Sequence, residues 1–168
     1  METQIWSLLN DVKFKGYCLG FVVDKFQKWD RNLNIFLALT SSGSIAAWAI
    51  WDINPFIWAG IIALSQVITV IKPYFPYFKY VKELNKKCFQ IDNLSIDLER
   101  LWYEYDNKTI DEKVAADRFF ELKKQVAEIF TFGDETIFDV TKKIETKANE
   151  RMEVYLKNNY EITIHTKS

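Results

Sequence analysis

The pattern of hydrophobic and polar positions divides the chain into segments of different character. Across residues 1–31, apolar residues recur at helical spacing among charged ones, which predicts an amphipathic helix. The pattern then changes, because residues 32–71 contain a single charged side chain, Asp52. Helical spacing returns afterwards and predicts helices at about 76–105, 110–131 and 135–158, followed by a polar tail at 161–168.

The nearly uncharged block is long enough for two membrane-spanning helices. A helix needs about 20 apolar residues to cross the hydrocarbon core of a bilayer, and residues 32–51 and 53–71 each approach that length. Neither segment has the charged face that a helical hairpin in a soluble domain usually keeps. Asn54 suits an N-cap and Pro55 the first helical position, so a very short turn would join the two spans. We therefore expect a two-span transmembrane hairpin over residues 32–72.

Basic residues on either side of the block predict its orientation. The turn between the spans has no Lys or Arg, whereas Lys25, Lys28 and Arg31 precede the first span and several lysines follow the second. Because loops rich in Lys and Arg stay on the cytoplasmic side, we expect both termini, and with them the amphipathic helix at 1–31, in the cytoplasm. Residues 73–160 would then form a cytoplasmic helical bundle or coiled-coil stalk. The expected fold is an all-α membrane protein whose first partner is the lipid bilayer.

Small and polar residues recur within both expected spans. In a helix, Thr40 and Ser44 lie on one face, and Gln66 is the polar side chain that is most costly to bury in lipid. One interpretation is that Gln66 bonds a hydroxyl of the first span and holds the hairpin or an oligomer together. The other is that these residues line a water-filled path in an oligomer, because two spans alone cannot enclose a pore. The candidate stripe consists of Thr40, Ser41, Ser44, Gln66 and Thr69.

The helix expected at 76–105 carries a seam of apolar residues at spacings of three and four. The spacing continues over about four heptads, is typical of a coiled coil and can join subunits, so we expect a homo-oligomer. Residues 106–108 interrupt the seam, and Thr109 with Glu112 has the spacing of a capping box for the next helix. The candidate oligomer seam consists of Val81, Leu84, Cys88, Ile91, Leu98 and Trp102.

Composition and motifs argue against an enzyme. The one histidine, His165, lies in the polar tail, and the chain lacks the common nucleotide-binding, hydrolase and metalloprotease motifs. Cys18 and Cys88 are far apart and belong to no metal-binding spacing. The net charge is −1, and no basic tract with interleaved aromatic residues points to nucleic acid. We expect no catalytic residue, no metal, no cofactor and no nucleic-acid partner.

The order of these parts resembles the SLATT family, two-transmembrane effector domains associated with bacterial nucleotide-signalling and antiphage defence systems. The resemblance rests on the amphipathic helix, the tight hairpin and the long heptad-patterned helix FKYVKELNKKCFQIDNLSIDLERLWYEY, and it covers roughly residues 25–105. It implies an effector that forms a pore or disrupts the inner membrane during abortive infection. The 168 residues show no sensor domain of the kind fused to many such proteins. We therefore expect a separate sensor or trigger protein, or a trigger that reaches the stalk directly.

The same pattern fits a second function of a different class. A membrane-anchored scaffold or adaptor would use the hairpin only as an anchor and would dock a cytosolic partner on its helices, without conducting ions. Such a protein would tolerate exchange of its hairpin for an unrelated one, whereas an effector would not.

Overall fold

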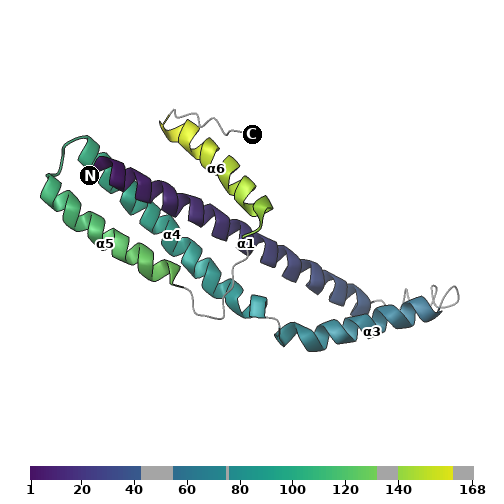
Figure 1. The fold of residues 1–168 in the computed structure, drawn as a ribbon. Coiled ribbons are helices and arrows are strands. Elements are labelled where there is room, and N and C mark those ends of the chain that lie inside the picture. The colour runs from purple at the N-terminus through teal and green to yellow at the C-terminus, as the bar shows by residue number, and fades with distance from the viewer. Residues whose placement is uncertain (43–54, 75, 132–139, 161–168) are drawn as a thin grey trace. The chain divides into compact units, whose positions relative to one another are not determined.

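The computed structural model describes residues 1–42, 55–74, 76–131 and 140–160, and most of these residues are helical, with non-helical connections at 107–111, 131 and 140–141. The expected all-α class is therefore confirmed. The described residues contain five α-helices and one 3₁₀ turn (Figure 1). They are α1 (Glu2–Ser42), α3 (Pro55–Ile71), η1 (Lys72–Tyr74), α4 (Pro76–Asp106), α5 (Glu112–Phe130) and α6 (Lys142–Tyr160).

The chain divides into two compact units, to which α1 and α4 both contribute. One comprises residues 1–22 and 84–168 and is called the bundle unit here; the other comprises residues 23–83 and is called the hairpin unit. Among the described residues, no helix combines the length and the apolar character needed to cross a lipid bilayer. Of the two expected spans, 32–51 is described as far as residue 42 and 53–71 from residue 55 onward.

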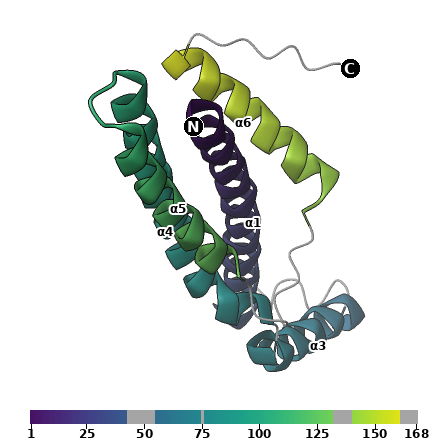
Figure 2. The same cartoon turned by 60° about the vertical axis from the view of Figure 1, so that its left-hand side comes forward.

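The core of the bundle unit is formed by one apolar face from each helix. On α1, Ile5, Leu9 and Val12 are fully buried at spacings of four and three, which is the periodicity of a helix packed along one side. Within this unit α1 lies between α6 on one side and the α4–α5 pair on the other (Figures 1 and 2). The buried apolar residues of α5 and α6 are Ala115, Phe119, Val126, Ile144, Ala148, Met152 and Leu156.

The heptad seam predicted for α4 is buried inside the bundle unit. Leu84, Ile91 and Leu98 are at most 3% exposed, and the ring of Trp102 packs against side chains of α1 and α6. Cys88 is partly buried, as is Val81 in the hairpin unit. The seam thus stabilises the fold of a single chain, because its side chains pack against other helices of the same chain. Assembly into an oligomer stays a prediction, and in this conformation it requires a different surface.

The face of α4 that packs is wider than the predicted seam. Leu94 and Leu101 are also buried, at 2% exposure each. Leu101 belongs to a cluster with Phe119 and Ala115, so α5 covers this side of α4 while α1 covers the seam. A two-stranded seam needs only one apolar line, whereas a helix with two neighbours needs a broader face.

The junction between α4 and α5 differs from the sequence prediction. Thr109 and Glu112 do not form a capping box, because the N-cap of α5 is Asp111, whose carboxylate accepts a bond from the Val114 N–H at 2.9 Å. The Thr109 hydroxyl instead donates to the Glu104 carbonyl at 2.7 Å. Thr109 is therefore used to end α4, and the next residue with a short polar side chain starts α5.

Candidate functional site

The hairpin unit exposes an extensive apolar surface. The helix α3 contains no charged residue, and its large apolar side chains are nevertheless exposed: Phe56 is 86% and Val70 is 65% exposed. Soluble monomers rarely leave contiguous apolar surface of this extent uncovered, and such surfaces mark contact with lipid or with another protein. The other large apolar residues exposed on α3 and on the adjoining part of α1 are Ile57, Ile62, Leu64, Val67, Ile71, Ile35 and Leu39.

A polar cluster joins the two arms of the hairpin unit where α3 ends. The Lys72 ammonium lies 2.9 Å from the Asp30 carboxylate and also donates to the Asn34 side-chain carbonyl. Asn34 in turn donates its amide N–H to Asp30 at 3.1 Å. These three residues, called the latch here, come from α1 and η1. Because a paired cation and anion cost less to desolvate than either alone, the latch is suited to a boundary between water and an apolar layer.

Aromatic side chains flank the latch on both arms. Trp29 precedes Asp30 on α1 and is 64% exposed, and Tyr74 follows Lys72 by two residues and is 82% exposed. Trp and Tyr combine an apolar ring with a polar group, and in membrane proteins they concentrate where the hydrocarbon meets the headgroups. The latch and these two rings therefore have the composition of an interfacial belt.

The structure places the described members of the predicted polar stripe on their own helices. The Thr40 hydroxyl donates to the carbonyls of Phe36 and Leu37, and the Thr69 hydroxyl donates to the Ser65 carbonyl at 2.8 Å. Neither bond joins the two arms. Gln66 is exposed, and a bond from it to a hydroxyl of the first arm stays a prediction. The side chain of Ser41 and the whole of Ser44 lie outside the described residues.

Sequence reasoning missed the residue that lies at the centre of the packed face of α3. Ser65 is 7% exposed, and its hydroxyl donates to the Ile62 carbonyl at 2.8 Å. Ile61 and Ile68, four residues before and three after, are partly buried, so these three residues form the packed face. The small size of Ser65 was the available signal, because small residues allow helices to approach closely in lipid. The sequence prediction chose Gln66 instead, because of its polarity, and this neighbouring residue lies on the exposed side of α3.

In the bundle unit, a partly buried ionic group fixes α6 to α1 and α4. The Lys13 ammonium lies 2.8 Å from the Glu99 carboxylate and 4.4 Å from the centre of the Tyr155 ring. The Tyr155 hydroxyl donates to the same Glu99 oxygen. Burial, together with this bond to a carboxylate, raises the pKa of Tyr155 far above its usual value. The phenol therefore stays protonated and acts as a donor, which is a structural role and not that of a catalytic base.

A three-ring aromatic cluster closes the same end of the bundle unit. The ring centres of Trp6 and Trp102 are 5.1 Å apart, and Tyr160 meets both rings edge-on at 4.7 and 5.4 Å. Tilted and edge-on aromatic pairs of this kind contribute about 0.5–1.5 kcal/mol each beyond their buried area. The cluster links α1, α4 and α6, so the last residue of α6 is held against the start of α1.

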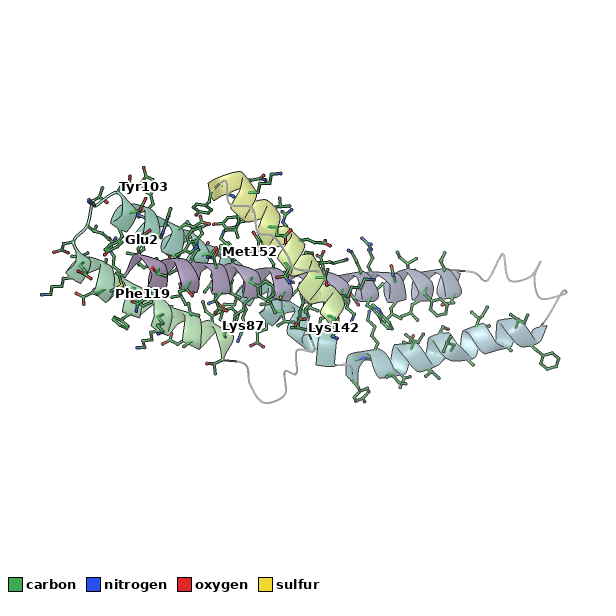
Figure 3. The ribbon with its side chains drawn as sticks, turned by 45° about the horizontal axis from the view of Figure 1, so that its top comes forward. Glu2, Lys87, Tyr103, Phe119, Lys142 and Met152 are labelled. Atoms are coloured by element: carbon green, nitrogen blue, oxygen red, sulfur yellow. The ribbon has the colours of Figure 1, made fainter. Side chains whose placement is uncertain are left out.

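Lys87 links α4 to the C-terminal end of α5. Its ammonium donates to the carbonyls of Ile129 and Thr131 at 3.0 and 2.9 Å (Figure 3). These carbonyls lie at the C-terminal end of α5, where a positive charge is favourable because the helix dipole is negative there. Lys87 thus stabilises the α4–α5 contact.

The described residues show little that points to chemistry. No group of three or more His, Cys, Asp or Glu side chains in this part of the chain is arranged to hold a metal ion. A cavity of 300 Å³ lies between α1, α5 and the start of α6, and its lining includes Phe14, Cys18 and Phe130. Burial raises the pKa of the Cys18 thiol, so this cysteine stays protonated, whereas a nucleophilic cysteine requires a lowered pKa.

In comparisons with known proteins, no family model, no curated protein and no solved structure matches this chain. The resemblance to the SLATT family therefore rests on the layout of the sequence alone.

Proposed function

We propose that this chain is an oligomeric effector of the bacterial inner membrane, which forms a pore or disrupts the membrane in antiphage defence by abortive infection. The hairpin unit enters the bilayer, and both termini remain in the cytoplasm. The observation that carries this proposal is the apolar surface exposed along α3. The part played in defence rests on the resemblance to the SLATT family.

The surface of α3 suits a hydrocarbon environment better than water. Burying apolar surface contributes about 25 cal/mol per Å², so a helix that exposes this many large apolar side chains gains from leaving water. The 17 residues of α3 extend for about 25 Å, close to the thickness of a hydrocarbon core of about 30 Å. The uncharged sequence continues on its N-terminal side to Ile53.

Three hydroxyls in the described part of the hairpin unit have hydrogen-bond partners of the kind that a lipid environment requires. A hydroxyl that faces hydrocarbon without a partner costs several kcal/mol, roughly 2–7 by transfer measurements. Thr40, Ser65 and Thr69 avoid this cost by donating to carbonyls one turn earlier in the same helix. Such bonds are the usual arrangement of Ser and Thr in membrane helices.

The latch sets the depth at which the unit would lie. Beyond Asp30 and Lys72, toward α3, the exposed side chains are mainly apolar; on the other side of Asp30, Asp24, Lys25 and Lys28 are exposed. Trp29 and Tyr74 lie where the exposed side chains change from charged to apolar. This order matches a membrane boundary at the latch, with the charged residues on the cytoplasmic side.

The decisive experiment follows the membrane potential of bacteria with a dye after induced expression. The parent is compared with the Ser44→Leu/Gln66→Leu double variant and with a Val67→Leu control, which changes an exposed apolar residue of the same helix. A pore lined by the polar stripe predicts depolarisation by the parent and the control but not by the double variant. Depolarisation by all three supports disruption without a polar path, and none by any of them, with the protein in the membrane fraction, contradicts a constitutively active effector.

A second candidate is the membrane-anchored scaffold, and a groove in the bundle unit favours it. The groove lies between α1 and α5, has a volume of 650 Å³ and includes Leu8, Phe119 and Phe120 in its lining. Phe120 is 62% exposed there. An adaptor would dock a cytosolic partner on such a surface. Exchange of residues 32–72 for an unrelated two-span hairpin would then leave its activity intact, whereas an effector would lose activity.

A further inference from the structure

The exposed face of α4 carries its own heptad line. Phe89, Ile96 and Tyr103 are seven residues apart, and their exposed fractions are 66%, 58% and 63%. Figure 3 shows Tyr103 pointing away from the bundle unit. Residues seven apart lie almost in one line along a helix, so these three side chains form a row of apolar positions on one side of α4, called the outer line here.

The outer line is distinct from the buried seam of the same helix. Phe89 and Ile96 follow Leu84 and Ile91 by five residues, which places the outer line about 140° around the helix from the seam. The seam is covered by α1, and other sides of α4 are covered by α5 and α6. The outer line therefore occupies the side of α4 that the chain itself leaves open.

The two borders of the outer line carry opposite charges. On one border lie Asp92 and Asp106, together with Glu99, which is paired with Lys13. On the other border lie Lys86 and Arg100. Glu104 also lies on that border, but both Arg100 and Arg118 contact its carboxylate, at 2.7 and 2.5 Å, so this border keeps a net positive charge.

We propose that the outer line of α4 is the surface through which a second copy of this chain binds, with the two α4 helices parallel. In a parallel pair related by a two-fold axis along the helices, the acidic border of each copy faces the basic border of the other. In an antiparallel pair, borders of the same sign would meet and repel. The charge pattern thus selects both a second copy as the partner and the parallel orientation.

The parallel orientation also agrees with the proposed membrane insertion. This inference rests on that proposed function, because the pair is expected to form between copies in one membrane. Copies that are inserted in one membrane with the same topology are related by rotation about the membrane normal, and this symmetry is compatible with a two-fold axis along paired, parallel α4 helices. Three apolar side chains bury far less area than a stable soluble dimer needs. The pair is therefore expected to form where a shared membrane raises the effective concentration of the copies.

The test is disulfide cross-linking of the full chain in bacterial membranes, in a background where Cys18 and Cys88 are replaced by alanine. A disulfide requires Cβ atoms about 4 Å apart, so a parallel pair predicts dimers from Phe89→Cys alone, from Ile96→Cys alone and from Tyr103→Cys alone. An antiparallel pair centred on Ile96 would cross-link only through Ile96→Cys and through a mixture of the other two variants. Lys147→Cys, an exposed position on α6, is the matched control and should stay monomeric.

Charge reversal tests the borders. Lys86→Glu/Arg100→Glu should reduce the Ile96→Cys cross-link at least several-fold, and adding Asp92→Lys/Asp106→Lys should restore it. If Lys86→Glu/Arg100→Glu acted only by destabilising the fold, the second pair of substitutions would not restore the cross-link. Circular dichroism of each purified variant checks that the fold is intact.

Membrane fractionation separates the two proposals. Chain that is absent from the membrane fraction contradicts the proposed function. Chain that is present there but yields no dimer from Ile96→Cys, or yields as much from Lys147→Cys, overturns the proposed surface and leaves membrane insertion standing.

Discussion

At the scale of single residues, the clearest determinant of packing is the absence of a side chain at Gly16. A Cβ built at Gly16 would lie 2.9 Å from the Cγ2 atom of Ile91, which is 1% exposed, so α1 and α4 approach each other closely here. At Gly20, one turn later on α1, a Cβ would meet no atom within 4 Å. The two glycines thus have different roles, although both lie within one helix. Only the neighbouring helix distinguishes them.

This difference predicts opposite effects of the same substitution. Gly16→Ala should lower the free energy of unfolding by about 1–2 kcal/mol, because the added methyl group overpacks a contact with a β-branched side chain. Gly20→Ala should raise it by about 0.5–1 kcal/mol, because alanine loses less conformational entropy in a helix than glycine does. Thermal or denaturant unfolding of the purified chain in detergent measures both. Equal effects of the two substitutions would contradict the close approach at Gly16.

At the scale of elements, the turn after α4 shows how a helix can end without glycine. The Thr109 N–H donates to the Glu104 carbonyl at 2.9 Å and the Lys108 N–H to the Tyr105 carbonyl at 3.0 Å, the bond pattern of a Schellman motif. Lys108 occupies its left-handed position, with a φ of 55°. Glycine adopts this conformation without steric cost, whereas lysine does not.

Lys108→Gly is therefore expected to stabilise the bundle unit by about 1 kcal/mol, in contrast to the usual effect of glycine in a helix. Lys108→Ala is the matched control, because it removes the charge and most of the side chain but keeps the Cβ that causes the strain. It should leave stability unchanged within about 0.5 kcal/mol. A gain in melting temperature from the alanine variant equal to that from glycine would show that the lysine charge, and not the backbone conformation, was unfavourable.

At the scale of the whole molecule, the division into two units separates two kinds of surface. The bundle unit has a core of buried apolar side chains and exposes a smaller set, among them Phe89, Ile96 and Phe120, whereas the hairpin unit leaves most of the large apolar side chains of α3 exposed. A protein in water would not favour the second arrangement, since apolar side chains are then hydrated. The proposed membrane location removes this conflict without any change in fold.

Accessibility of introduced cysteines to a membrane-impermeant maleimide checks this assignment. In the background without native cysteines, Lys28→Cys should react in inverted membrane vesicles, and Val67→Cys should react in neither inverted nor right-side-out vesicles. Val67 is 52% exposed in the structure, so lipid must cover it if the thiol is to be unreactive. Rapid reaction of Val67→Cys from either side would place α3 in water or along an aqueous path. After solubilisation in mild denaturant, both variants should react.

The sequence by itself determined the helical class, the approximate ends of α4 and the central line of its buried face, but not Leu94 and Leu101, which widen that face. Leu84, Ile91 and Leu98 could be identified from their spacing because the period of a helix brings them to one side, whatever packs there. The contrast between the uncharged block and the rest of the chain was likewise readable from composition. These properties are local, because each depends on residues within a few turns of one another.

Only the tertiary structure decided what covers each face. Spacing cannot tell whether the α4 seam meets another chain or α1, since both would bury the same residues. Glu99 pairs with Tyr155, which is 56 positions away, and Lys87 caps α5 through a carbonyl 42 positions away. No local sequence pattern predicts contacts between residues so far apart. Gln66 was favoured over Ser65 for its polarity, but the rotation of α3 against its neighbour decides which of two adjacent residues is buried. Partners, unlike periodicity, are set by how the helices come together in space.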